Sequence, residues 1–317
     1  MNHVFVPNAQ SLFVNHTQTP PTFYVNEHFM QMACGLIDFQ KKLEQDKIKV
    51  YPKPTAACPY PAMNPIFVWA INQMQQLSID TNIFNGFEVN PYLNVLQKFA
   101  VENSQLLNYP QPIHCDTLKN VFNRLRAELY TAKAKLHASK YLVEVQKFRN
   151  EQKSVFRRVM QTKEQANCIF LDLPILSCTN NFHYSIYEEI EKKSVKMVKK
   201  YLKSLHEAAQ LKDILYDIHW RIIKGLDHQL SAQAFVYIIG DDMDYLPLLK
   251  EQWELVCLDY QLQGIFSMPK HTHCYDGQGI TQKAWLQLIE RVHEPLSFYR
   301  YKGNGITYAW KKYTGNV

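Results

Sequence analysis

The sequence predicts a mixed protein of the α+β or α/β class, with a helical first half and a second half of interleaved strands and helices. Apolar residues recur at steps of three and four between residues 116 and 136, which is typical of an amphipathic helix. From Cys168 onward, short apolar runs typical of strands alternate with helical patterns. Hydrophobic residues make up 46% and aromatic residues 13% of the 317-residue chain, enough for a packed core.

The residue pattern of the first half predicts a proline-rich arm followed by basic helices. Pro65 and Pro91 stand at helix starts, where a first turn tolerates proline. Asp116 supplies an acidic cap for a long helix whose apolar stripe runs from Leu118 to Leu136. The helices expected in this half cover residues 27–45, 65–77, 90–107, 116–136 and 143–160.

The second half predicts three strands and three helices. The strands are expected at residues 168–173, 215–223 and 234–239, and the helices at 187–207, 246–256 and 281–301. The whole chain is therefore expected to divide into an irregular arm (1–62), a basic helical region (63–165) and an α+β domain (166–317).

Composition narrows the class of protein. No apolar run is long enough to span a membrane, and the first residues lack the pattern of a secretory signal. Seven scattered cysteines without a Cys-x-x-Cys pair argue against a disulfide framework or a zinc ribbon. We therefore expect a cytoplasmic protein without a membrane partner.

Positive charge is concentrated in one stretch of the chain. Residues 118–160 contain eleven Lys and Arg against three Glu, while the net charge of the whole chain is only +6. Such a surplus favours a polyanionic partner such as DNA, although solvated helix faces show the same pattern. The candidate nucleic-acid contacts are Arg124, Arg126, Lys133, Lys147, Arg149, Lys153, Arg157 and Arg158.

Several landmarks of the second half resemble a known family in their order and spacing. They are Leu171-Asp-Leu173, a lysine-rich helix, Trp220 with Gly225, the apolar run 235–239, Trp253, Gly264, Gly277, Gly279 and Tyr299-Arg-Tyr-Lys302. This order is similar to that of inovirus-type replication initiators of filamentous phages and prophages, which are related to the HUH rolling-circle endonucleases. The resemblance covers roughly 135–150 residues and implies an α+β domain with a central antiparallel sheet flanked by helices, as in HUH and RRM-like folds.

The resemblance also implies a chemistry, which is metal-dependent nicking of single-stranded DNA. In the family, two histidines on a strand hold Mg²⁺ or Mn²⁺, and a helical tyrosine attacks the phosphate. Tyr299 matches that nucleophile, and Lys302 matches a lysine on the same helical face. The two histidine positions fall on Ser231 and Gln233, and the third ligand position falls on Ile223, so the metal site is degenerate.

The function implied is therefore that of a DNA-binding, replication-initiator-like protein of a phage-like or integrated element in a bacterial host. Nicking is expected to be impaired or lost; if it survives, Tyr299 would cut DNA and carry the strand. The expected partner is single-stranded or origin DNA. A non-enzymatic nucleic-acid-binding module fits the same residues.

A different interpretation starts from the acidic string at residues 242–248. Asp242-Met-Asp-Tyr-Leu-Pro-Leu is similar to a motif of NYN-type (PIN-like) metal-dependent ribonucleases, in which carboxylates at strand ends bind Mg²⁺. Asp172, Asp242 and Asp244 would form that site. The spacing from Asp227 to Asp242 leaves no room for the helix that separates the family's motifs, and an acidic cap on the following helix explains the string equally well.

Overall fold

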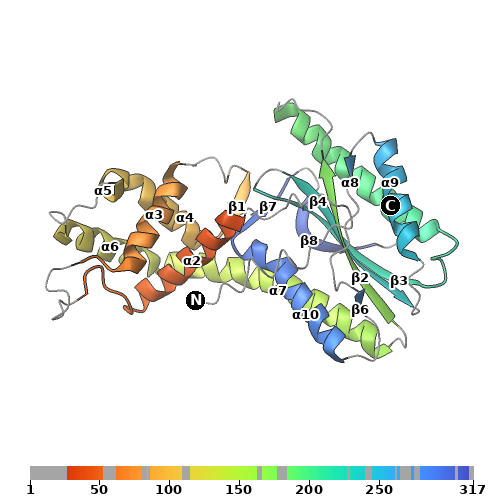
Figure 1. The fold of residues 1–317 in the computed structure, drawn as a ribbon, viewed down its shortest axis with the longest axis horizontal. Coiled ribbons are helices and arrows are strands. Elements are labelled where there is room, and N and C mark those ends of the chain that lie inside the picture. The colour runs from red at the N-terminus through yellow and green to blue at the C-terminus, as the bar shows by residue number, and fades with distance from the viewer. Residues whose placement is uncertain are drawn as a thin grey trace. The chain divides into compact units, whose positions relative to one another are not determined.

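The computed structural model divides into two compact units, which confirm the α+β class. A helical unit contains residues 27–144 and 297–299, and an α+β unit contains residues 145–296 and 300–313 (Figure 1). The structure describes residues 27–52, 62–79, 84, 86–108, 115–162, 166–176, 184–226, 229–239, 245–260, 263–264, 273–274, 279–303 and 306–313.

The helical unit packs around a cluster of phenylalanines. Phe39, Phe67, Phe99 and Phe122 are buried, and the rings of Phe67 and Phe122 lie edge to face with centroids 4.9 Å apart. The elements of this unit are α2 (Glu27–Glu44), α3 (Pro65–Ile79), β1 (Phe87–Val89), α4 (Pro91–Glu102), α5 (Ser104–Asn108), α6 (Cys115–Leu129) and the first part of α7 (Ala132–Thr162).

Helices α3 and α4 begin where Pro65 and Pro91 predicted, and an asparagine caps each of them. The side chain of Asn64 accepts a hydrogen bond from the Ile66 N–H at 3.0 Å, and that of Asn90 accepts one from Tyr92 at 3.0 Å. The helix expected over 90–107 is interrupted at Asn103, whose side chain donates to a carbonyl of the last turn of α4 at 2.8 Å.

The long helix expected over 116–136 is also interrupted, and this part of the prediction is wrong. The Thr131 hydroxyl donates to the Glu128 carbonyl at 2.9 Å and accepts from the Ala134 N–H at 3.2 Å. Thr131 therefore ends one helix and caps the next, although the apolar stripe continues across the break. The second basic helix, expected to begin near residue 143, begins at Ala132 instead.

The α+β unit is built on an antiparallel sheet. Its order is β5-β2-β4-β3-β8, and β6 also pairs with β2; every pairing between these strands is antiparallel. Besides the second part of α7, its elements are β2 (Ala166–Leu176), α8 (Tyr184–Glu207), β3 (Leu215–Lys224), β4 (Leu230–Ile239), α9 (Tyr245–Asp259), β5 (Gln263–Gly264), β6 (His273–Cys274), α10 (Gly279–His293), a 3₁₀ turn (Glu294–Ser297), most of β7 (Tyr299–Tyr301) and β8 (Thr307–Lys312).

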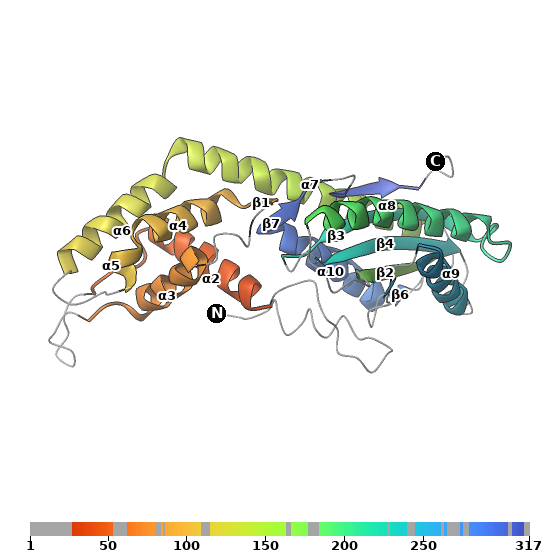
Figure 2. The same ribbon diagram turned by 90° about the horizontal axis from the view of Figure 1, so that it is seen from above.

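Helices cover both faces of the sheet (Figures 1 and 2). Because side chains alternate along a strand, Leu171, Trp220 and Val236 point to the face covered by α8 and α9, where they pack with Tyr201 and Trp253. This is called the apolar face below. The opposite face, called the polar face, is covered by α7 and α10. The apolar residues that pack there include Phe156, Phe170, Phe235 and Trp285.

The three strands and two of the three helices expected in the second half match the structure, whereas β5, β6, β7 and β8 were not predicted. The helix expected over 281–301 ends at His293, because Pro295 lacks an N–H and disfavours helical geometry at the residue before it. Residues 299–301 form strand β7 instead. Among the described residues, no helix is both long and apolar enough to cross a membrane.

Candidate functional site

A row of three polar side chains crosses the middle of the polar face. Asp172 on β2 pairs in register with Gln233 on β4, which pairs with Arg221 on β3. Ser231 lies two residues before Gln233 on β4, so it points to the same face, and it pairs with Ile223 on β3. Asp172, Arg221, Ser231 and Gln233 are at most 4% exposed. Burial of so many polar groups requires that they bond to one another.

Arg221 is the centre of this buried cluster. Its Nε and Nη2 both donate to Gln233 Oε1, at 2.9 and 2.7 Å. Nη2 also donates to the Val292 carbonyl at 2.9 Å, and Nη1 donates to the Tyr308 carbonyl at 3.3 Å. The guanidinium stacks on Trp310, 4.3 Å from the ring centroid. Burial lowers the pKa of Arg221 to about 9, and the Asp172 carboxylate opposes this, so the side chain stays charged at neutral pH.

A histidine from α10 extends the cluster. The Trp310 Nε1–H donates to His293 Nε2 at 2.7 Å, and His293 Nδ1 lies 2.7 Å from the Ile289 carbonyl. Nδ1 therefore carries the proton and Nε2 accepts, which is a neutral imidazole. Burial, followed by the nearby charge of Arg221, holds the pKa of His293 well below its usual range.

Asp172 is the acidic member of the cluster. Its Oδ1 accepts a short hydrogen bond from the Ser231 hydroxyl, while its Oδ2 has no hydrogen-bond partner among the described residues. Burial raises the pKa of Asp172 to about 7, against the lowering effects of Ser231, Gln233 and Arg221. The carboxyl group is therefore close to half protonated at neutral pH.

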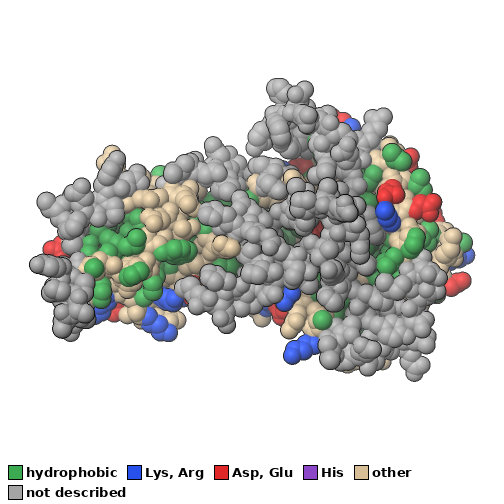
Figure 3. Space-filling model, in the orientation of Figure 1, with side chains coloured by type: hydrophobic (Ala, Val, Ile, Leu, Met, Phe, Trp, Pro, Cys, Tyr) green, Lys and Arg blue, Asp and Glu red, His purple; other side chains and the backbone are tan. Residues whose placement is uncertain are grey.

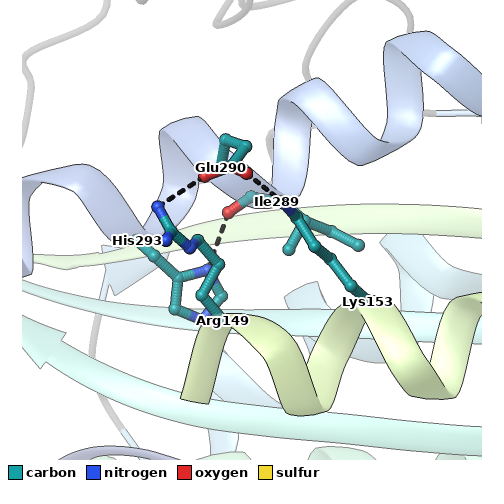
Figure 4. Close-up of polar contacts among 5 residues, drawn as sticks. All are labelled: Arg149, Lys153, Ile289, Glu290 and His293. Carbon is teal, nitrogen blue, oxygen red and sulfur yellow. Dashed lines mark hydrogen bonds and ion pairs between the residues drawn. The ribbon is translucent and has the colours of Figure 1, made fainter. Parts of the chain in front are cut away.

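An ion-pair bridge joins α7 to α10 beside His293 (Figure 4). Arg149 donates to Glu290 Oε2 at 2.7 Å, and Lys153 donates to the other carboxylate oxygen of Glu290. The Lys153 side chain is only 18% exposed and that of Arg149 is 33% exposed. Both cations therefore serve the packing of the two helices.

These residues do not fit a divalent metal. Gln233 Oε1 already accepts two bonds from Arg221, and the Ser231 hydroxyl is bonded to Asp172, so only one carboxylate oxygen is open. The guanidinium would repel a second cation placed in this row. Nor does the described part of the chain contain a group of three or more His, Cys, Asp or Glu side chains that could hold a metal ion.

The three predicted metal-ligand positions do come together. Ser231 and Gln233 are on the central strand β4, and Ile223 faces Ser231 from β3, all on the polar face. Sequence reasoning missed Arg221 and His293, although one signal was available. A lone arginine between Trp220 and Ile222 in an apolar strand must point to the opposite face, where it needs buried partners.

Tyr299 is not on a helix, so the expected helical face shared with Lys302 is a further wrong prediction. Tyr299 is the first residue of β7 and is 5% exposed. Its ring packs edge to face with Phe29 and Phe87, at 5.8 and 5.7 Å between centroids, within the helical unit. Lys302 belongs to the α+β unit, where its ammonium lies 5.2 Å from the centroid of the Tyr308 ring. The proline turn that ends α10 separates both residues from the helix.

The alternative acidic site is only partly described. Asp172 does not end its strand as expected, because β2 continues through Leu176 in antiparallel pairing with β4. It therefore faces the covered middle of the sheet. Asp242 and Asp244 lie outside the described residues.

The basic residues predicted to contact nucleic acid fall into two groups. Four are held by carboxylates: Arg126 by Asp46 at 2.9 Å, Lys147 weakly by Glu151 at 3.9 Å, and Arg149 and Lys153 by Glu290. The other four are exposed on the helices α6 and α7: Arg124, Lys133, Arg157 and Arg158.

Comparisons with protein-family models, with curated proteins and with solved structures give no match.

Proposed function

We propose that this chain is a DNA-binding protein related to replication initiators, acting for a phage-like or integrated element, and that its metal-dependent nicking is lost. The observation that carries the proposal is the bond between Arg221 and Gln233. Gln233 stands at the strand position where the resembling family has a metal ligand. Its side chain instead accepts two hydrogen bonds from the buried guanidinium of Arg221.

The sheet supports the initiator-like part of the proposal. Residues 231–233 lie on β4, which has antiparallel neighbours on both sides, β2 and β3. A nuclease of the NYN type would need Asp172 at the end of a strand, and its place in the middle of β2 gives that alternative no support.

Burial supports the loss of nicking. A phosphodiester can react only where it reaches both the metal ligands and the nucleophile. Ser231 and Gln233 are 0% and 4% exposed on the polar face of the sheet, and the Tyr299 ring is packed among other aromatic rings. The side chains at these positions act as core residues, and DNA binding then depends on exposed cations such as Arg124 and Arg157.

The test uses the whole chain with single-stranded oligonucleotides in Mg²⁺ or Mn²⁺. We expect binding that weakens steeply with salt, with neither cleavage nor a covalent protein–DNA adduct on a denaturing gel. A Tyr299-dependent adduct, absent from Tyr299→Phe, would disprove the loss of nicking. Absence of binding at low salt would disprove the DNA-binding function itself.

A further inference from the structure

A second cationic surface lies on α8, outside the basic stretch that the sequence singled out. Lys192, Lys196, Lys199 and Lys203 follow one another at steps of four, three and four residues. Positions three and four apart share one side of a helix, so these lysines form a single line about 16 Å long. The opposite side of α8 is buried against the apolar face of the sheet. The line therefore faces solvent.

Carboxylates neutralise only part of this surface. Lys192 and Lys203 have distant partners on α8, Glu188 at 3.8 Å and Glu207 at 3.7 Å. Exposed pairs of this kind contribute little to stability and exchange readily for a stronger anion. Lys196 and Lys199 have no ion pair with any described residue. The flanking ion pairs of this surface join Lys193 to Glu189 and Lys200 to Asp259.

A lysine from β8 lies close to this line. Burial and the positive charge of Lys199 both lower the pKa of Lys311, because the two ammonium groups are close enough to repel each other. The Lys311 ammonium lies 5.3 Å from the centroid of the Trp220 ring. Positive charge is thus concentrated where α8 approaches β8.

Aromatic rings accompany the lysines. The Lys200 ammonium lies 5.9 Å from the centroid of the Tyr260 ring, at the end of α9. The exposed His206 imidazole packs edge to face with Tyr313, with centroids 5.7 Å apart. Both tyrosines are partly exposed. On the face in Figure 3, charged side chains of both signs and hydrophobic ones lie next to one another in the region of α9.

We propose that this α8 surface binds single-stranded nucleic acid. The line of lysines contacts consecutive phosphates, and the rings of Tyr260 and Tyr313 stack on unpaired bases. In a duplex the bases are stacked on one another. A duplex would therefore bind through the lysines but could not stack its bases on the tyrosine rings. A membrane is excluded as the partner of α8 because the apolar side of the helix is already buried in the core.

This inference rests on the proposed nucleic-acid binding and assigns it to a surface. The decisive variant replaces the four lysines of the line with glutamine in the whole chain, and anisotropy of a labelled oligo-dT is measured over a range of salt. We expect binding to weaken at least about tenfold at moderate salt, with a salt slope smaller by about 0.7 for each phosphate that the variant no longer binds. Circular dichroism should show an unchanged melting temperature, because all the replaced side chains are at the surface.

A matched control removes the same number of charges elsewhere. Replacing Lys47, Lys49, Lys98 and Lys283 by glutamine should change the affinity less than about twofold. A third variant, Arg157→Gln with Arg158→Gln, tests α7. If the α8 variant binds like the unmodified chain while the α7 variant is weakened, the inference is wrong and the proposed function stands. If the unmodified chain does not bind at all, both are wrong.

The aromatic part is tested by Tyr260→Leu with Tyr313→Leu. Loss of stacking should weaken oligo-dT binding about fivefold or more while leaving inorganic polyphosphate binding unchanged. Equal weakening for both ligands would contradict the stacking of bases. Poly-glutamate that displaces oligo-dT at equal charge concentration would show that the surface recognises anions in general, and would overturn the assignment to nucleic acid.

Discussion

The two faces of the sheet differ in chemistry although the same strands build both. The apolar face consists mainly of hydrophobic contacts between the sheet and α8 and α9, with one buried ion pair between Lys224 on β3 and Glu191 on α8. The polar face surrounds the Arg221 cluster with aromatic and aliphatic side chains from α7 and α10. A buried charge is costly unless it is fully bonded, so the polar face depends on a few specific partners whereas the apolar face depends on shape and volume.

The largest expected effect comes from removing the central cation of the polar face. Arg221→Met keeps the length of the side chain but leaves Gln233, the Val292 carbonyl and the Tyr308 carbonyl without their donor. We expect a loss of about 3–5 kcal/mol in the free energy of unfolding, measured by urea denaturation. A loss below about 1 kcal/mol would mean that the cluster is relaxed or hydrated, and that bonding within it is not what holds the polar face.

A core truncation on the apolar face should cost somewhat less. Leu249 is fully buried on α9, and Leu249→Ala should lower the free energy of unfolding by about 3 kcal/mol, because it removes buried methyl groups and leaves a cavity. The titratable groups in this packing include Tyr201 and Cys257, and burial raises the pKa of each further above its usual range, so the loss should be the same at pH 5 and pH 8. A pH-dependent loss would contradict the contrast between the faces.

The raised pKa of Asp172 predicts how stability responds to pH. The folded chain keeps this proton up to about pH 7, whereas the unfolded chain loses it near the ordinary aspartate value of 3.8. The stabilisation is fully present below about pH 3.8 and is lost as the pH rises to about 7, with an expected magnitude of up to about 4 kcal/mol. Subtracting the stability curve of Asp172→Asn isolates this slope, since the opposite effect of His293 is present in both proteins.

An exposed aspartate gives the matched control for this measurement. Asp213→Asn makes the same substitution at an exposed position and controls for the loss of one carboxylate. If the stability curve of Asp172→Asn ran parallel to that of the unmodified chain, the description of the polar face would be wrong.

The smallest effect is expected from divalent metal. A ligand that binds only the folded chain stabilises it by about 2.7 kcal/mol at one hundred times its dissociation constant. The oxygen atoms of Gln233 and Ser231 that could ligate a metal are already hydrogen-bonded to other side chains. Adding Mn²⁺ or EDTA should therefore leave the urea midpoint unchanged within error. A metal-dependent shift that Gln233→Leu abolishes would show that the cluster opens to hold a cation.

Much of the fold could be predicted because its periodic segments are long. The helix expected over 187–207 and the strand expected over 215–223 match α8 and β3 closely, since buried and exposed positions recur regularly in both. Helix boundaries that depend on a single residue were harder to predict. Thr131 caps a new helix inside a continuous apolar stripe, and Pro295 ends α10 before Tyr299.

The site was predicted in part. The spacing from Trp220 and Gly225 located Ser231 and Gln233, and the structure places them together with Ile223 on one face. Arg221 was not selected, because strand periodicity gives the face of a side chain but not the partner opposite it. Contacts such as the bond from Trp310 to His293 join residues that only the folded sheet and α10 bring together.

The sequence by itself determined the α+β class, the alternation of strands and helices, and the absence of histidines at the two strand positions, because these depend on local periodicity and residue identity. Only the tertiary structure decided that those positions are buried and that Tyr299 starts a strand. The tertiary structure also decided which lysines are exposed to solvent and which form ion pairs with carboxylates. These outcomes depend on burial, and burial is fixed by segments that are distant in the chain.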